Sequence, residues 1–449
     1  MKTRKPAARD RQKRVDLVPA KRNPRLASVC AATLSTCLLL ALASRGAEAK
    51  ETFSIDYIVT VSATNPHTAQ VRWELTGIEE VKHLRLRFPS ARFDSFHGTG
   101  KLRPVEGGLV WEPGGPYAHL TYRVKIDHIR GQRQRYDSYA GHDWIVTRAR
   151  NLFPRIDIDC HPDTKGTPKS RARLIFRLPR GWRSAAPLPA LGPGTYHLSE
   201  PGKILDRPRG WFALGKFNLD RQEIAQIMIE LVRMPGSTLP PTELFHFLDR
   251  TLPTLKKLLL AGPETLLVVS APDPMWHGGI SGEHSFFMHT GRPLRTPDKT
   301  SPYLHELFHV LQPYKPAADA DWIEEGLAEF YSLELQRRAG LIDAAAYARA
   351  LGYFERFGLW NVDLTQQQDN AATNNSAPLV MHALDQRIQR ATAGKKRLDD
   401  VVTELAQEGG EVNTTRFLHT VNQVSGKNFT RFFDRHVLRG APPDVDGAH

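Results

Sequence analysis

The sequence predicts an α+β protein in which a β-rich region precedes a mainly helical one. Between residues 52 and 217, short and partly alternating apolar runs are separated by Gly, Pro, Asn and Ser clusters, as in a β-sandwich. From residue 301 onward, apolar residues recur at helical spacing. A chain of 449 residues has room for two or three domains. We therefore expect a sandwich-like β domain at 50–220, a helix-rich α+β domain at 221–440 and a tail at 441–449.

The individual elements follow from these patterns in chain order. The residues between 292 and 301 and between 312 and 321 are polar and contain proline, so we expect exposed connections there. The strands expected in the first region are Ile55–Val61, Ala69–Leu75, Leu84–Phe88, Leu120–Ile126 and Ala172–Leu178; in the second region we expect a helix at Thr242–Leu260, a buried strand at Thr265–Ser270 and a last helix at Asn428–Val437.

The first 49 residues differ from the rest of the chain. A basic run is followed by an apolar stretch at Leu26–Ser44, and Ala47-Glu48-Ala49 has the small-x-small pattern of a signal-peptidase site. We interpret 1–49 as a signal peptide and expect an exported protein, periplasmic or secreted. The alternative is an uncleaved membrane anchor, because the apolar run is close to spanning length. No later segment is long and apolar enough to cross a membrane.

The charge and cysteine content follow from this leader. Residues 1–49 hold 11 lysines and arginines against 3 acidic residues, so about +5 of the formal charge of +13 belongs to the remainder. This weakens any nucleic-acid-binding interpretation, and we expect no nucleic-acid partner. Two of the three cysteines lie in the leader, so the remaining Cys160 cannot form an internal disulfide.

The run Ser301–His309 (SPYLHELFH) predicts a helix with a defined start. Ser301 can cap the helix, and Pro302 suits its first position. Pro313 then ends it. The buried stripe of this helix is expected to be Leu304, Leu307, Phe308 and Leu311.

On such a helix, His305 and His309 lie one turn apart on the same face. Their imidazoles can converge on a single cation, with Zn–N distances of roughly 2.0–2.1 Å. Glu306 then lies beside the metal without binding it, placed to take a proton from a zinc-bound water. A helix with two surface histidines is the simpler alternative, and only a third ligand decides between the two.

A third ligand is available on the next predicted helix, which begins with Asp321–Tyr331 (DWIEEGLAEFY). Asp321 and Glu324 form a plausible capping pair, and Gly326 would let the two helices approach closely. The expected core face is Ile323, Leu327 and Phe330, and Gly340 marks the end of the helix.

Two glutamates share the opposite face of this second helix. Glu325 and Glu329 are spaced i, i+4, so a carboxylate from this face can complete a His2Glu site with an open position for water. For Glu329 we favour a supporting role, in which it orients one of the ligand histidines. For Glu324 the simpler interpretation is a solvated cap.

These motifs resemble those of the gluzincin metallopeptidases. H-E-L-F-H followed by W-I-E-E-G is similar to the glycyl aminopeptidase family, with its thermolysin-like catalytic domain, and the stretch Gly278–Ser285 (GGISGEHS) resembles a G-G-x-E-H-x-x-S strand of that family with two extra residues. The resemblance implies one zinc ion with Glu325 as its third ligand. It also implies that a substrate peptide lies along the edge strand near Gly279, with its free amine near Glu283; the alternative for Glu283 is an edge-strand charge that discourages aggregation. Further similarity covers most of the chain after the leader, at Tyr57–Phe88, Leu398–Val401 and Val424–Phe433.

The chain departs from that family in two respects. The relatives usually carry a PDZ module after the catalytic domain, and we expect none here. They also carry Y-x-K-G at the start of a late helix, with the tyrosine holding the developing oxyanion, whereas Asn374 stands at that position here. An asparagine amide can donate to an oxyanion, and loss of one such donor costs about 10²–10³ in rate. Tyr331 and His382 are the other candidate donors, although a histidine on an apolar helix is more often a packed core residue.

Two other groups of residues were weighed as sites. The run Asp157–His161 (DIDCH) has metal-ligand chemistry, but its irregular spacing favours a strand end that runs into a turn. Tyr136, Tyr139 and Trp144 are most simply explained as core or domain-interface packing. No G-x-S-x-G element supports serine-hydrolase chemistry.

The sequence therefore favours a zinc-dependent peptidase acting on peptides or proteins, aminopeptidase-like before endopeptidase, with Glu306 as general base. The alternative is a zinc-binding but catalytically weak protein that holds a peptide or partner in the cell envelope, and Asn374 is its main support. A metal-free envelope protein is the third interpretation.

Overall fold

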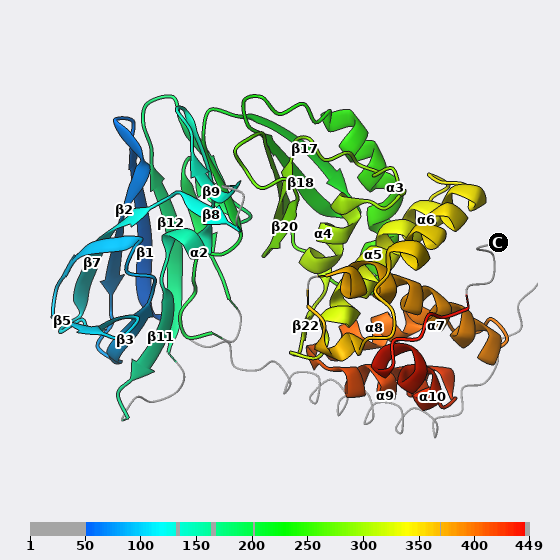
Figure 1. Cartoon of the computed structure of the whole chain (residues 1–449). Coiled ribbons are helices and arrows are strands. Elements are labelled where there is room, and N and C mark those ends of the chain that lie inside the picture. The colour runs from blue at the N-terminus through cyan, green and yellow to red at the C-terminus, as the bar shows by residue number, and fades with distance from the viewer. Residues whose placement is uncertain (1–50, 132–134, 163–167, 201–202, 369, 445–449) are drawn as a thin grey trace, which may run out of the picture. The chain divides into compact units, whose positions relative to one another are not determined.

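The computed structural model describes residues 51–131, 135–162, 168–200, 203–368 and 370–444 (Figure 1). The predicted signal peptide at 1–49 lies outside these ranges, as do residues 445–449 of the predicted tail. The described residues combine several sheets with a set of helices, which confirms the α+β class. The predicted domain boundaries stay predictions.

Between residues 51 and 215 the described strands form three sheets, one mixed and two antiparallel. The seven-stranded sheet has the order β14 (Ala190–Gly192), β15 (Thr195–Leu198), β12 (Lys169–Arg177), β1 (Glu51–Ser62), β2 (Asn65–Thr76), β7 (Tyr117–Lys125) and β4 (Phe93–Gly98). In this sheet β1 and β12 pair in parallel, and the other pairs are antiparallel. The five-stranded sheet has the order β13 (Arg183–Ala185), β16 (Trp211–Gly215), β10 (Trp144–Arg148), β9 (Arg135–Ala140) and β8 (His128–Arg130), and the four-stranded sheet has the order β11 (Arg155–Cys160), β3 (Val81–Arg87), β6 (Gly108–Glu112) and β5 (Lys101–Val105).

These three sheets share one hydrophobic core. Alternate residues of each strand point inward, because successive side chains of a strand lie on opposite faces. The aromatic rings of Tyr57, Trp73 and Tyr122 meet edge to face at its centre, with centroids 5.5 and 5.9 Å apart. Leu84 and Trp111 of the four-stranded sheet belong to the same core. The DIDCH run forms β11, where Asp157 pairs with an arginine of β3, so the interpretation as a strand rather than a metal site fits its contacts.

A fourth sheet follows and is covered on both faces. Leu267, Val269 and Phe287 pack against the β region on one face, together with Trp144 and Trp211. The alternate residues of the same strands pack against the helices on the other face. The order of this sheet is β17 (Asn218–Ile224), β18 (Ile227–Arg233), β19 (Thr265–Ala271), β21 (Ser285–His289) and β20 (Gly279–Gly282), so β20 is an edge strand.

Helices dominate after residue 300, as the sequence predicted (yellow-green to red in Figure 1). The segment 312–321 is not a plain loop, however, because β22 (Tyr314–Pro316) pairs in parallel with β23 (Gly410–Val412). None of the described helices is long and apolar enough to span a bilayer. The helices are α2 (Ala149–Leu152), α3 (Pro241–Leu259), α4 (Pro302–Leu311), α5 (Asp321–Arg338), α6 (Ala344–Phe357), η1 (Leu364–Gln366), η2 (Ala372–Ser376), α7 (Ala377–Ala391), α8 (Leu398–Glu408), α9 (Thr414–Ser425), α10 (Thr430–Phe433) and η3 (Asp434–Leu438).

Candidate metal centre

Helix α4 forms where the sequence predicted it. The Ser301 hydroxyl accepts from the backbone N–H of Leu304 at 3.3 Å, and Pro302 occupies the first turn. The apolar stripe of the helix is fully buried against the core, which leaves the other face to His305 and His309. Their rings lie one turn apart, with centroids 4.7 Å from each other.

Helix α5 brings a carboxylate to these two histidines. The Nε2 atoms of His305 and His309 are 3.1 Å apart. The Glu325 carboxylate lies 3.2 Å from Nε2 of His305 and 3.6 Å from Nε2 of His309. The structure thus gathers the three predicted ligands around one point, in a group whose geometry suits a metal ion.

The donor set fits zinc. Four ligands placed tetrahedrally at ~2.0–2.1 Å from an ion are about 3.3–3.4 Å from one another. The three distances among His305, His309 and Glu325 fall on both sides of this value. Two imidazoles and one carboxylate are also the ligand set that leaves a fourth position open in catalytic zinc sites.

Glu329 supports this arrangement from behind. Nδ1 of His305 lies 2.9 Å from Oε2 of Glu329, and an ionised carboxylate only accepts. In the neutral form of His305, which is the form that can bind a metal, the proton therefore sits on Nδ1 and the lone pair of Nε2 faces the centre. The predicted supporting role of Glu329 matches this contact.

Glu324 is placed differently from the prediction. We expected Asp321 and Glu324 to form a capping pair, but the N-cap position of α5 falls on Ala320, whose carbonyl accepts from the N–H groups of residues 323 and 324. The Glu324 carboxylate instead accepts from Nε2 of Gln312 at 2.9 Å and lies 3.4 Å from Nδ1 of His309. The capping prediction was wrong, because contacts with α4 outweigh the local signature.

Gly326 also has a different neighbour from the one expected. We predicted that it lets α5 approach the helix of the histidines. A Cβ at this position would lie 2.9 Å from the Cβ of Ala377, which begins α7. Gly326 therefore allows the close approach of α5 and α7, and this prediction was wrong about the partner.

The pKa values of His305 and Glu325 are shifted in opposite directions by their mutual attraction. Burial lowers the pKa of His305, but the carboxylates of Glu325 and Glu329 outweigh it and raise this pKa well above its ordinary value. Burial raises the pKa of Glu325, yet the two histidines outweigh it and lower this pKa to about 2. Glu325 is thus an anion at neutral pH, as a zinc ligand must be.

Glu306 lies between the metal centre and the edge strand. Its carboxylate accepts from the backbone of Ser281, and burial raises its pKa while the two histidines partly lower it. A Cβ on Gly279 would lie 2.5 Å from Oε1 of Glu306. A side chain at position 279 would therefore displace the Glu306 carboxylate, which lies next to the predicted ligands and outside their group of three.

Comparison with known proteins identifies the fold. No family model matches the chain, and no curated protein is similar to it in sequence. Among solved structures, an aminopeptidase N family protein from Idiomarina loihiensis superposes with a TM-score of 0.68 at 15% identity, over 87% of this chain and 77% of that one.

Two further structures agree with this result. An M1 zinc metallopeptidase from Deinococcus radiodurans matches with a TM-score of 0.57 at 16% identity, over 88% of this chain and 95% of that one. The aminopeptidase A of Legionella pneumophila matches with 0.55 at 12% identity, over 88% of this chain and 50% of that one. This chain has the M1 zinc metallopeptidase fold. The gluzincin resemblance is confirmed at the level of fold, and the glycyl aminopeptidase subgroup stays a prediction.

The three candidate oxyanion donors have other contacts. The Tyr331 hydroxyl donates to Asp399 at 3.0 Å, and its ring stacks on Phe308. His382 is buried between Tyr347 and a glutamine of its own helix, and burial lowers its pKa to about 4. The Asn374 amide donates to a backbone carbonyl of the preceding turn at 3.0 Å. The oxyanion role of each stays a prediction.

Glu283 occupies the turn between β20 and β21. Its carboxylate lies 2.5 Å from Nη1 of Arg209, so it is already paired with a cation from the β region. An incoming amine would have to share Glu283 with this guanidinium. Recognition of the substrate amine by Glu283 stays a prediction.

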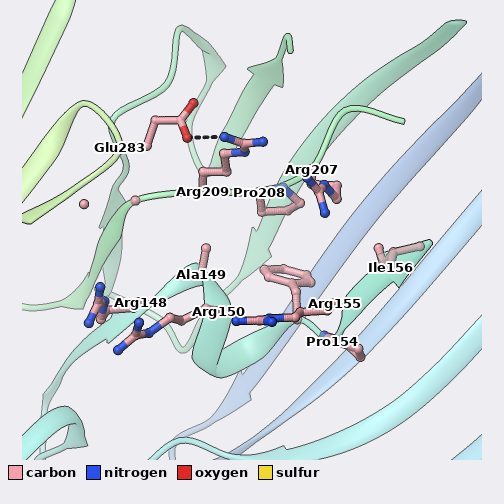
Figure 2. A pocket seen from close by; sticks show the side chains of 13 residues that line it. Arg148, Ala149, Arg150, Pro154, Arg155, Ile156, Arg207, Pro208, Arg209 and Glu283 are labelled. Atoms are coloured by element: carbon pink, nitrogen blue, oxygen red, sulfur yellow. Dashed lines mark hydrogen bonds and ion pairs between the residues drawn. The ribbon is translucent and has the colours of Figure 1, made fainter. Parts of the chain in front are cut away.

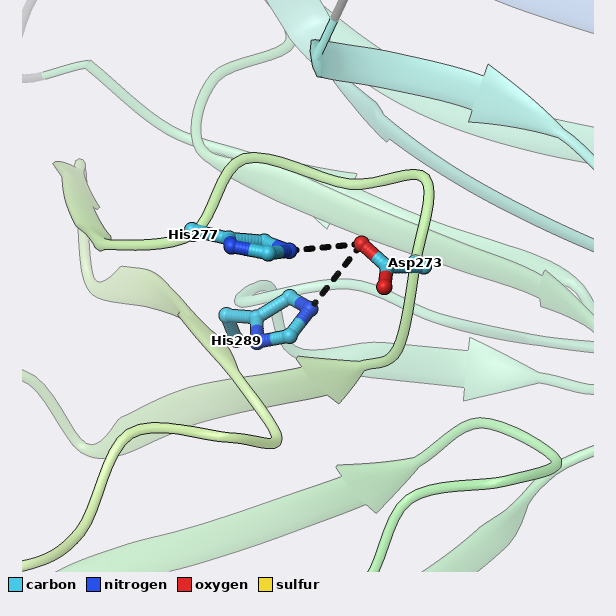
Figure 3. Close-up of side chains that lie close together, drawn as sticks. All are labelled: Asp273, His277 and His289. Atoms are coloured by element: carbon cyan, nitrogen blue, oxygen red, sulfur yellow. Dashed lines mark hydrogen bonds and ion pairs between the residues drawn. The ribbon is translucent and has the colours of Figure 1, made fainter.

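A second group of two histidines and a carboxylate lies beside β20, and sequence spacing gave no signal for it. Nε2 of His277 is 2.6 Å from Oδ1 of Asp273, and Nε2 of His289 is 3.8 Å from the same atom (Figure 3). The N–H of Gly291 donates to Nδ1 of His289, so the proton of neutral His289 sits on Nε2, the nitrogen that faces the carboxylate. Asp273 is also paired with Arg135. These contacts favour a hydrogen-bonded cluster over a metal site.

Proposed function

We propose that this chain is a zinc-dependent peptidase of the aminopeptidase type. The observation that carries the proposal is the convergence of His305, His309 and Glu325, whose nearest ligand atoms are 3.1–3.6 Å apart. Solved proteins with the same fold give support, since one of them is a zinc metallopeptidase whose mutant was crystallised with a Tyr-Ser-Ala substrate. We propose one zinc ion per chain.

The chemistry follows from the side chains around that site. A zinc ion held by His305, His309 and Glu325 would supply Lewis-acid chemistry to a water molecule and to the carbonyl of the scissile bond. Glu306 takes the proton from the attacking water and passes it to the leaving amine. Burial raises the pKa of Glu306, which makes it a better proton acceptor than an exposed carboxylate.

Strand β20 offers a place for the substrate backbone. It is an edge strand, so those of its outer N–H and C=O groups that other residues do not engage can pair with an extended peptide. The backbone of Ser281 is already bound by Glu306 and Arg148. Gly279 lies against Glu306, and this contact ties the strand to the reacting carboxylate. We propose that the substrate lies along β20 with its amino end toward Glu283.

One observation favours a second candidate, a zinc-binding protein with little or no catalysis. Asn374 takes the place of the expected tyrosine, and its amide already donates to a backbone carbonyl. Such a protein would hold a peptide along β20 without cleaving it.

Metal analysis and one substitution separate these functions. Purified protein should hold about one zinc per chain, and its absence would favour the metal-free interpretation. Glu306→Gln should keep the zinc and lose about 10²–10⁴ in the rate of cleavage of peptides with a free amino end. Glu355→Gln, an exposed glutamate of α6, is the matched control. Cleavage of amino-terminally blocked peptides as well would indicate an endopeptidase. Equal inertness of wild type and Glu306→Gln with zinc bound would favour the second candidate.

We also propose that the protein acts after export, in the periplasm or outside the cell. The support is the leader pattern of residues 1–49. Amino-terminal sequencing of the exported protein should begin at Lys50, whereas an intact leader in the membrane fraction would indicate an anchor.

A further inference from the structure

A cavity of about 260 Å³ opens next to the turn that carries Glu283. Arginines line it from two sides: one group comes from the end of β10, α2 and the start of β11, and the other from the segment before β16 (Figure 2). We call it the arginine pocket. Its arginines are Arg148, Arg150, Arg155, Arg207 and Arg209.

The described carboxylates do not balance these charges. Asp137 is shared by Arg148 and Arg150, at 3.8 and 3.4 Å. Glu200 is shared by the two arginines of the other side, and one of these also pairs with Glu283. Arg155 is exposed, and within the ranges that the structure describes no carboxylate lies within ion-pair distance of it. Five guanidinium groups therefore outnumber three ion-paired carboxylates, and the Glu306 carboxylate acts on Arg148 from farther away. The pocket keeps a positive excess.

The pocket lies close to the reacting groups. Nη2 of Arg148 donates to the carbonyl of Ser281 at 3.4 Å, and its guanidinium stacks over the Trp211 ring at 5.4 Å. The same Ser281 donates its backbone N–H to Glu306. The next two residues line the pocket: Gly282, which ends β20, and Glu283 in the turn that follows.

Arg148 is largely buried, and its ion pair with Asp137 is long, at 3.8 Å. Its side chain is 13% exposed, and burial together with the neighbouring Arg150 lowers its pKa to about 10. It remains charged at neutral pH. A carboxylate entering the pocket would add charge-assisted hydrogen bonds, and guanidinium groups can form these in bidentate geometry.

We propose that the arginine pocket binds a carboxylate of the peptide substrate, so that this site selects acidic peptides. This inference rests on the proposed peptidase function. A peptide paired with β20 directs alternate side chains to the same side, and one of them reaches the pocket past Ser281. Because the amino end of the peptide is placed toward Glu283, which lines this pocket, the carboxylate belongs to an Asp or Glu side chain near that end. A carboxyl end of the peptide in the pocket would reverse the proposed orientation, and the test separates these two sources.

The first measurement compares kcat/KM for peptides that differ in one group. Each peptide carries Glu or Gln at a single position, and each is made with a free or an amidated carboxyl end. In one of these two comparisons, Glu against Gln or free against amidated carboxyl end, we expect the kcat/KM of wild type to be at least tenfold higher for the peptide with the carboxylate. A Glu/Gln preference identifies the side chain as the source, and a free/amidated preference identifies the chain end. A ratio near one in both comparisons, with cleavage intact, would overturn the pocket and leave the peptidase proposal standing.

The second measurement uses a charge reversal. Arg155→Glu should lower the preference for the carboxylate peptide at least tenfold, and because this side chain is exposed the thermal unfolding midpoint should not fall. Arg180→Glu, an exposed arginine outside the pocket, is the matched control and should leave the preference unchanged. An equal preference in wild type and Arg155→Glu would contradict the assignment.

A binding measurement keeps the inference testable if no peptide is cleaved. Calorimetric titration of the zinc-loaded protein with the same Glu and Gln peptides should then show at least tenfold tighter binding of the Glu peptide. Selective binding without cleavage would support the pocket and end the peptidase proposal. Binding that ignores the carboxylate would overturn the pocket.

Discussion

Glu329→Gln tests whether a carboxylate behind His305 tunes the affinity of the centre for zinc. In the wild type, Nδ1–H of His305 donates to Oε2 of Glu329 at 2.9 Å. Glutamine keeps the size of the side chain and can still offer an oxygen, but it removes the negative charge. The substitution therefore isolates the electrostatic part of this contact.

The magnitude follows from the type of hydrogen bond. A bond to a charged group contributes about 1.5–3 kcal/mol, and a neutral one about 0.5–1.5 kcal/mol. The loss is therefore about 1–1.5 kcal/mol, which corresponds to a roughly tenfold weaker Kd for zinc, since 1.4 kcal/mol is tenfold. Outer carboxylates of this kind typically change metal affinity by 10–100-fold, so Glu329→Ala should fall at the upper end of that range.

Competition with a chromophoric zinc chelator measures this directly. The Kd should rise about tenfold in Glu329→Gln, and Glu355→Gln on the exposed face of α6 should match the wild type. A Kd within twofold of wild type for both Glu329 variants would refute the reasoning, because His305 would then not depend on this partner.

Three further substitutions test contacts of helix α5 and of strand β20. Burial raises the pKa of Glu334, but the two arginines in the last turn of α5 outweigh it and lower this pKa from 4.5 to about 2, a shift that corresponds to about 3 kcal/mol of stability. Because the folded-state pKa is the lower one, this stabilisation is present above about pH 4.5 and is lost as the pH falls toward 2. The free energies of unfolding of wild type and Glu334→Gln, measured in urea, should therefore differ by about 3 kcal/mol at pH 7 and by clearly less at pH 3. A difference that does not change with pH would contradict the assignment. Gly326→Ala places a methyl group 2.9 Å from Ala377, so calorimetry should show a destabilisation of about 1–3 kcal/mol, and an unchanged melting temperature would show that α5 and α7 can separate freely. Gly279→Ala pushes a Cβ into Glu306, so kcat should fall at least tenfold while the zinc content stays at that of wild type; full activity would show that the strand is not held against this carboxylate.

Local signals in the sequence predicted α4 and its histidines well. A capping serine, a proline at the first position and an apolar stripe all act within one helix, and the structure bears out each of them. The i, i+4 spacing of His305 and His309 fixes their common face whatever the rest of the chain does. The same holds for the amphipathic helix expected at 242–260, which is α3.

Features that depend on contacts between distant segments could not be predicted in the same way. Ala320 is the N-cap of α5, and the Glu324 carboxylate accepts from Gln312 at the end of α4. A capping signature contains no information about that neighbour. Gly326 was correctly expected to permit a close approach, but only the fold shows that the partner is α7.

The arginine pocket shows the same limit at larger range. Its two groups of arginines lie more than fifty residues apart in sequence, and each by itself resembles an ordinary basic turn. The cluster around Asp273 was missed because its two histidines have no regular spacing. A site of this kind becomes visible only when the strands that carry it have been placed.

The central sheet has a consequence for any attempt to study the helical half alone. Leu267, Val269 and Phe287 are completely covered, and part of their cover comes from Trp144 and Trp211 of the β region. A fragment that begins after residue 217 would expose this apolar face to water, next to an unpaired edge strand. Such a fragment should self-associate, so the helical half of this protein needs the β region to cover its central sheet.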